Sequence, residues 1–186
     1  MKKRCFWVSN DPLYIEYHDN EWGVPTFDDA ELFEFLILET FQAGLSWITI
    51  LKKRENFRKA FDNFDYEKIA NYGENKYEEL LMDAGIIRNK LKIRSAITNA
   101  KLFMEVQKEF GSFSKFFWSY TDGKPIVNHF NKREEVPATT ALSDKISKDL
   151  KKRGFKFVGS TVIYAYMQSM GMVNDHTTDC FRYNEV

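Results

Sequence analysis

One apolar segment near the start of the chain places the strongest constraint on the fold. Residues 32–38 are apolar except for Glu34, and Asp28 with Glu31 resembles the capping box that begins a helix. The pattern ends near residues 43–44, Ala-Gly, a sequence typical of a helix terminus. We therefore predict a buried helix here, and the rest of the chain must pack around it.

Helical patterns recur along most of the remaining sequence, whereas alternating strand patterns are nearly absent. The stretch from Thr121 to Thr140 contains two of the four prolines, and we expect a long surface connection with short extended pieces. We predict an all-α fold in a single domain over residues 1–186. The expected helices are 47–60, with Ser46 as its cap, a short helix after Asp65, and 76–83, 87–110, 113–119, 143–153 and 160–170.

Composition excludes several classes of protein. The 27 basic and 27 acidic residues cancel, so any surface that binds a polyanion must be local. Two cysteines are too few for a disulfide framework. No signal sequence or membrane-length apolar run is visible, so we expect a cytoplasmic protein without a membrane partner, and a monomer.

A possible metal site lies at the two ends of the chain. Cys5 and His18 occur early, and His176 and Cys180 stand four positions apart near the other end. Two thiolates and two imidazoles form a complete tetrahedral set for Zn²⁺, which leaves no position for a reactive water. The metal would then be structural. The alternative is a pair of buried free cysteines with ordinary polar histidines.

Glu39 is the ionisable residue of the segment Phe35–Trp47, where a carboxylate would lose its water. A carboxylate in an aromatic pocket can accept hydrogen bonds from the exocyclic amine of a purine, and its charge favours a cationic base. The alternative is that Glu39 points outward or pairs with a lysine or arginine. Trp47 could stack on a base or belong to the core.

Further aromatic residues accompany the early metal ligands. Trp7, Tyr14, Tyr17 and Trp22 occur in a segment that is too irregular to be one helix. They could line a pocket or cover the core.

The segment from Lys151 to Gly159 separates two predicted helices and looks like the turn of a helix-hairpin-helix element, which would span about 143–171. Gly154 and Gly159 permit close approach of the backbone, Lys156 can neutralise a phosphate, and amides near Ser160 can bind one. A plain corner between helices with solvated lysines is the alternative. The basic residues of 52–54 and 88–94 have the pattern of ordinary solvated faces.

Several blocks of the chain closely resemble the DNA-3-methyladenine glycosylase I family. They include Asp11–Tyr14, Tyr17–Pro25, Gln42–Ile48, Lys151–Gly159 and Val173–His176, so the resemblance spans almost the whole sequence. It implies an all-helical member of the helix-hairpin-helix glycosylases. It also implies one structural Zn²⁺ per chain, which joins segments 5–18 and 176–180 through Cys5, His18, His176 and Cys180.

The resemblance also implies roles for individual residues. Glu39 would recognise the methylated adenine, Trp47 would stack on it, and Tyr17 would make a further contact, with Tyr14 and Trp7 as weaker candidates. DNA contacts would come from Gln42, Gly44 and Leu45, which would enter the gap left by the flipped nucleotide, and from Gly154, Lys156, Gly159 and Ser160. Asn174 falls near a position where related glycosylases carry a catalytic aspartate, but we assign no catalytic role to Asp175.

The expected function is therefore base-excision repair. The protein would flip 3-methyladenine out of alkylated double-stranded DNA and release it hydrolytically, leaving an abasic site without strand cleavage. A non-enzymatic, zinc-stabilised DNA-binding module is the alternative, although it has no use for a carboxylate among aromatics. A zinc-dependent hydrolase of small substrates would need an open coordination position, which four protein ligands do not leave.

Overall fold

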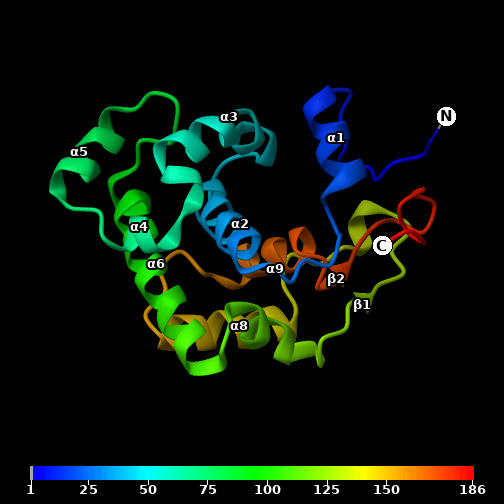
Figure 1. The fold of residues 1–186 in the computed structure, drawn as a ribbon. Helices are drawn as coiled ribbons and strands as arrows, with labels where there is room; N and C mark the ends of the chain where they lie inside the picture. Colours follow the sequence, from blue (N-terminus) through cyan, green and yellow to red (C-terminus); the bar gives the residue numbers. More distant parts are fainter. Residues whose placement is uncertain (1) are drawn as a thin grey trace.

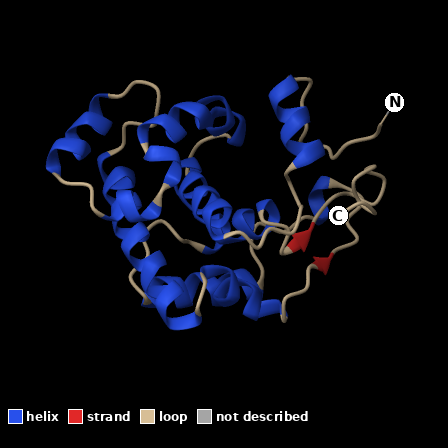
Figure 2. Cartoon of the chain, viewed as in Figure 1, coloured by secondary structure: helices blue, strands red, loops and turns tan. Residues whose placement is uncertain are grey.

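The computed structural model describes residues 2–186 and is predominantly helical, as predicted (Figure 1, Figure 2). Within this range, two strands of two residues each make a minimal parallel pair. The helices are α1 (Pro12–Asn20), α2 (Asp29–Gln42), α3 (Trp47–Ala60), α4 (Tyr66–Ala70), α5 (Glu74–Met82), α6 (Lys90–Phe110), α7 (Phe113–Trp118), α8 (Ala141–Lys152) and α9 (Ser160–Ser169). The strands are β1 (Ile126–Val127) and β2 (Val173–Asn174), and 3₁₀ turns cover Asp62–Phe64, Ser119–Thr121 and Arg133–Glu135.

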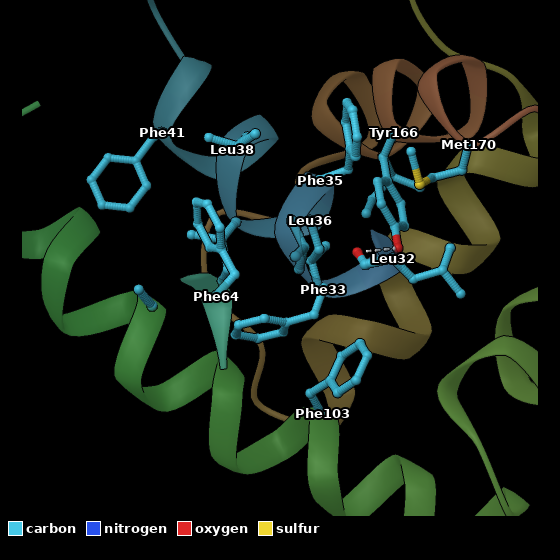
Figure 3. Packing of buried hydrophobic residues seen from close by; sticks show 14 of the residues in the cluster. Leu32, Phe33, Phe35, Leu36, Leu38, Phe41, Phe64, Phe103, Tyr166 and Met170 are labelled. Atoms are coloured by element: carbon cyan, nitrogen blue, oxygen red, sulfur yellow. Dashed lines mark hydrogen bonds between the residues drawn. The ribbon is translucent and has the colours of Figure 1, made fainter. Parts of the chain in front are cut away.

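The predicted buried helix is α2, which lies at the centre of the core (Figure 3). The Asp28 carboxylate accepts a hydrogen bond from the Glu31 amide at 3.0 Å and so begins the helix. Side chains around the helix are buried, because α2 contacts α3, α6, α7 and α9 on different sides. One contact is polar: the Tyr166 hydroxyl of α9 donates to the Leu32 carbonyl at 2.7 Å.

The end of α2 is held by a buried lysine. Lys92 of α6 donates from Nζ to the carbonyls of Phe41 and Ala43, at 2.8 and 2.7 Å. These bonds satisfy carbonyl groups that a helix leaves free at its C-terminus. The expectation of a solvated basic face is wrong for Lys92, and burial lowers the pKa of this amine.

Arg54 also departs from the predicted solvated face. Its guanidinium forms ion pairs with Glu21 and Glu34, both at 2.7 Å, and lies over the ring of Phe35. The side chain is only 13% exposed, so it links α3 to α2 and to the segment after α1 instead of facing a ligand.

Helix starts differ from the predictions where a polar residue caps the helix at another position. Asn89 caps α6, which begins three residues later than expected. Thr140 and Ser143 form a reciprocal capping box, so α8 starts at Ala141. Ser46 precedes α3 as predicted, but its hydroxyl pairs with Thr49 and makes no bond to the helix backbone.

The sequence analysis missed α1. Asp11 caps this helix and Pro12 occupies its first turn, but it buries only Tyr17 and His18, so its apolar pattern is weak. The expected extended piece within 121–140 is β1, which pairs with β2 so that Ile126 faces Val173. Figure 1 shows α1, this strand pair and both chain ends grouped on one side of the molecule. Among residues 2–186, no helix is long and apolar enough to span a bilayer.

Candidate functional site

A cavity of about 170 Å³ lies where α1, α2, α3 and α9 meet. A cavity of roughly 150 Å³ is large enough for benzene, so this space can hold a flat heterocyclic ring. We call it the aromatic pocket. Its lining residues are Phe6, Trp7, Tyr14, Tyr17, Trp22, Glu39, Gln42, Trp47, Val136, Ala165, Gln168, Ser169 and Asp175.

Glu39 is the buried acid of this pocket. Its side chain is 2% exposed, and no lysine or arginine pairs with it in the described chain, so the outward or ion-paired alternative is wrong. Ser169 donates from Oγ to Glu39 Oε1 at 2.6 Å. Burial raises the pKa of Glu39 to about 8, although the bond from Ser169 opposes that change. The pocket thus favours the protonated form of this carboxyl more than water does.

Aromatic rings form much of the pocket wall. The ring centroids of Trp7 and Tyr14 are 5.1 Å apart, and those of Tyr17 and Trp47 are 5.5 Å apart. The indole N–H groups of Trp7 and Trp47 are buried and have no hydrogen-bond partner within residues 2–186. Tyr17 differs, because its hydroxyl donates to Ser169 Oγ at 3.2 Å. The aromatic residues that the sequence suggested for a pocket therefore do line one cavity.

Several lining residues were not identified from the sequence. Ser169 and Gln168 come from the end of α9, Phe6 precedes α1, and Val136 belongs to the connection that we interpreted as a surface loop. No spacing or motif distinguishes a single serine at a helix end from an ordinary one. Only the packing of α9 against α2 shows that Ser169 faces Glu39.

Asp175 is a second buried acid on the pocket lining. It accepts hydrogen bonds from Asn128 Nδ2 at 2.7 Å, Tyr164 Oη at 2.5 Å and Gln168 Nε2 at 2.9 Å. These contacts tie α9 to the segment after β1. Asn174 does not line the pocket; its side chain bonds the Tyr183 carbonyl and the His176 amide.

The four predicted metal ligands form one buried cluster. Their donor atoms all lie within 4.8 Å of one another. The distance from Cys5 Sγ to His176 Nδ1 is 3.4 Å, and that from Cys180 Sγ to His18 Nε2 is also 3.4 Å. In a tetrahedral zinc site with Zn–S near 2.3 Å and Zn–N near 2.0 Å, sulfur and nitrogen are about 3.5 Å apart. The donor set therefore fits Zn²⁺ in both chemistry and spacing.

The groups around this cluster orient its imidazoles. His18 Nδ1 lies 2.8 Å from Asp19 Oδ1, and His176 Nε2 lies 3.0 Å from the Trp22 carbonyl. Acceptors of this kind fix the tautomer that leaves the other ring nitrogen for a metal. Gly23 has a φ of +81°, and a Cβ there would lie 2.9 Å from His176 Nε2. Glycine is required at this position both for the turn and for the imidazole.

One thiol of the cluster, that of Cys180, loses its proton more easily than an ordinary cysteine. Hydrogen bonds from the Cys5 thiol and from the two imidazoles lower the pKa of Cys180. The thiolate is the form that binds metal. The cluster also lies directly behind the pocket, since Trp7 packs on His18 and Trp22 packs on His176 with centroids 5.3 and 4.6 Å apart.

The turn between α2 and α3 borders the pocket. Gln42 Nε2 donates to the Leu45 carbonyl at 2.8 Å, which holds the turn together. Gly44 has a φ of +81° and no atom near its missing Cβ, and the Leu45 side chain is 37% exposed. The turn is thus exposed and carries one apolar side chain, that of Leu45.

The connection between α8 and α9 contains two glycines and an exposed lysine. Gly154 has a φ of +99°, Gly159 is the residue before α9, and no side chain in the described part of the chain caps the first amides of that helix. Asn99 fixes the connection by bonding both the amide and the carbonyl of Lys156, at 2.8 and 3.0 Å. The Lys156 side chain is exposed, and the Ser160 hydroxyl pairs with Ser143.

The protein is thus helical, with an acid buried among aromatic rings, an exposed turn beside the pocket and a cysteine–histidine cluster. A family model described as methyladenine glycosylase matches residues 7–183. The chain belongs to the methyladenine glycosylase family, which confirms the predicted enzyme class, an N-glycosyl hydrolase.

Known relatives resemble this chain over nearly its full length. DNA-3-methyladenine glycosylase 1 of Escherichia coli (strain K12) is 51% identical over 181 residues, which is 97% of each chain. A crystal structure of 3-methyladenine DNA glycosylase I matches with a TM-score of 0.94 and 52% identity over 96% of this chain and 98% of the other. A crystal structure of a tyrosine-to-phenylalanine variant of 3-methyladenine DNA glycosylase I, in complex with 3-methyladenine, matches with a TM-score of 0.93 and 35% identity over 96% of both chains.

Proposed function

We propose that this protein removes 3-methyladenine from alkylated double-stranded DNA by hydrolysis, as a monofunctional base-excision repair glycosylase. The observation that carries this proposal is the buried Glu39 carboxyl on the wall of an aromatic pocket, in a chain whose relatives are named for this activity. A DNA-binding module without catalysis would gain nothing from burying an acid at such a cost.

Recognition of the base combines stacking with charge. Trp47 and Tyr17 offer ring faces to a flipped purine, and Glu39 accepts from its exocyclic amine. The indole N–H of Trp7 or Trp47, which has no partner among the described residues, matches the ring-nitrogen acceptors of adenine. A cationic base also favours the charged form of Glu39, so binding of the base lowers the pKa of this carboxyl and promotes loss of its proton. Neutral adenine provides no such gain and is rejected.

Catalysis then requires little chemistry from the protein. Methylation at N3 gives the base a positive charge while it is attached to the sugar, so the glycosidic bond breaks with its electron pair moving to the base, which leaves as neutral 3-methyladenine. Water adds to the sugar carbon and loses a proton, which leaves an abasic site. The protein contributes binding of the departing base and its orientation. None of the described pocket-lining residues is a lysine, in keeping with hydrolysis without a covalent intermediate.

Two surface features would hold the DNA. We propose that Gln42, Gly44 and Leu45 fill the gap left by the flipped nucleotide. We also propose that α8, the connection 153–159 and α9 act as a helix-hairpin-helix element, in which the uncapped amides of α9 bind a phosphate. The N-terminus of α9 and Ser169 lie on one helix roughly 13 Å apart, so a phosphate contact and the pocket are rigidly connected.

Replacing Lys156 with alanine is expected to weaken binding to duplex DNA several-fold, regardless of its sequence. The slope of log affinity against log salt should fall by about one, because one phosphate contact is lost. Titration of fluorescent duplex at several salt concentrations measures both quantities. Lys68→Ala, at an exposed lysine on α4, is the control and should leave both unchanged; equal effects of the two variants would contradict the proposed DNA surface.

We further propose that Cys5, His18, His176 and Cys180 hold one Zn²⁺. It would supply structural cross-linking of the two ends of the chain, since four protein ligands leave no position for a substrate. A monomeric state and a cytoplasmic location remain predictions.

The decisive experiment measures which bases are released from methylated DNA. Chromatography should show free 3-methyladenine far in excess of 7-methylguanine. The DNA should break only after alkaline treatment, and borohydride should trap no protein–DNA adduct. Absence of any released base would reject the enzymatic proposal, and an adduct would reject its monofunctional mechanism.

A further inference from the structure

Ser169 joins three elements at the pocket. Its Oγ accepts from the Tyr17 hydroxyl of α1 at 3.2 Å and lies 2.6 Å from Glu39 Oε1 of α2. A second acceptor is also in range, because the Ala165 carbonyl in the preceding turn of α9 is 3.0 Å away. Ser169 is only 4% exposed.

A hydroxyl group has one proton, so Ser169 cannot donate to Glu39 and to Ala165 at the same time. When Glu39 is charged, the proton faces the carboxylate. When Glu39 is protonated, the serine proton can turn to Ala165, and Oγ can accept from the acid as well as from Tyr17. The Ala165 carbonyl tolerates the exchange because helix carbonyls also accept from the backbone.

We propose that Ser169 is a positioning residue for Glu39. The Ser169 hydroxyl donates to the charged carboxylate and accepts from the protonated acid, so one Glu39 oxygen is hydrogen-bonded in both charge states and the second oxygen is left for the base. This inference rests on the proposed role of Glu39 in base recognition. It explains how a buried acid can change between its neutral form and a charged form beside a cationic base without leaving a polar atom unsatisfied.

Other ionisable groups near Glu39 do not take this role. Tyr17 and Tyr166 are the phenols that feel its charge, and burial raises the pKa of both well above the ordinary value, so they stay protonated. Asp175 shares the pocket, but its oxygens are occupied by three donors. Ser169 is the side chain that donates to Glu39 in the described structure.

The test is a titration of the Glu39 side chain by ¹³C NMR in the intact protein. A hydrogen bond to a carboxylate is about twice as strong as one to a neutral group, so Ser169→Ala should raise the titration midpoint by about one pH unit. Ser169→Cys, which keeps the size but donates weakly, should raise it by less. An unchanged or lowered midpoint in both variants would overturn the proposal.

Thr40→Val is the matched control. Thr40 is a buried hydroxyl beside Glu39 in sequence, but it donates to the Ile37 carbonyl at 2.7 Å. This variant should lose stability without moving the midpoint, and an equal shift would show that any buried hydroxyl suffices. The titration needs no DNA, so it decides the role of Ser169 even if base release fails.

A binding measurement links the residue to recognition. Ser169→Ala should weaken the affinity for 3-methyladenine about tenfold near neutral pH. In the Glu39→Gln background the same change should have almost no effect, because the coupled partner is gone. Additive losses in the double variant would contradict a role through Glu39.

Discussion

Glu39→Gln is expected to slow the release of 3-methyladenine from DNA by about 100-fold or more. Glutamine has nearly the same shape, but it cannot carry the negative charge that favours a cationic base in a pocket with little water. Single-turnover kinetics on methylated DNA measures the loss. Glu31→Gln, in the exposed first turn of the same helix, is the control and should keep full activity.

The pH dependence of this activity follows from the raised pKa of Glu39. Because the free carboxyl titrates near pH 8, and because the charged form recognises the base, kcat/KM should rise with pH up to about 8 and then level off. In Glu39→Gln this limb should be absent. A wild-type profile that is flat between pH 6 and 8, or one that falls there, would contradict recognition by the carboxylate.

The same variant should be more stable than the wild type. Burial raises the pKa of Glu39 from 4.5 to about 8 in the folded protein, so protonation stabilises the fold. That contribution is complete below pH 4.5 and is lost as the pH rises through 8. Above pH 8, Glu39→Gln should gain up to about 5 kcal/mol in the free energy of unfolding. Lower activity with higher stability distinguishes a functional acid from a structural one.

Loss of the metal cluster is expected to have the second large effect. His18→Ala should abolish binding of one Zn²⁺ per chain and lower the free energy of unfolding by about 3 kcal/mol or more. For a chain of this size, the melting temperature should fall by about 10 °C. Atomic absorption and thermal unfolding measure the two effects, and a chelator added to the wild type should reproduce them.

The third histidine provides a matched control for the cluster. His129 is exposed and lies outside the cluster, so His129→Ala should keep the metal and the melting temperature. If wild-type protein expressed in the presence of zinc contains none, the proposal of a structural metal is wrong. Turnover that disappears on chelation at an unchanged melting temperature would instead indicate a catalytic metal.

The core could be predicted because its apolar periodicity is strong. Most helices around α2 were located from that signal together with capping residues such as Asp28 and Asp65. The missed helix α1 has little apolar pattern, although Asp11 and Pro12 were a usable start signal. The strand pair is too short for alternation to be seen, and its partners are 47 positions apart.

The site was predictable where rare residue types combine with the family resemblance. Glu39, Trp47 and Tyr17 meet in one pocket, and the four predicted metal ligands meet in one cluster. Ser169 and Val136 could not be found, since their importance comes only from long-range packing. The raised pKa of Glu39 could not be predicted from the sequence either, because it depends on the degree of burial.

The position of the metal ligands sets the order in which a newly made chain becomes complete. Translation proceeds from the N-terminus, and 171 positions separate Cys5 from His176. Until His176 and Cys180 have been made, Cys5 and His18 lack two of their partners, and Trp7 and Trp22 lack the imidazole support behind the pocket. A product terminated before His176 would therefore lack two of the four residues of the cluster and the imidazole that packs against Trp22.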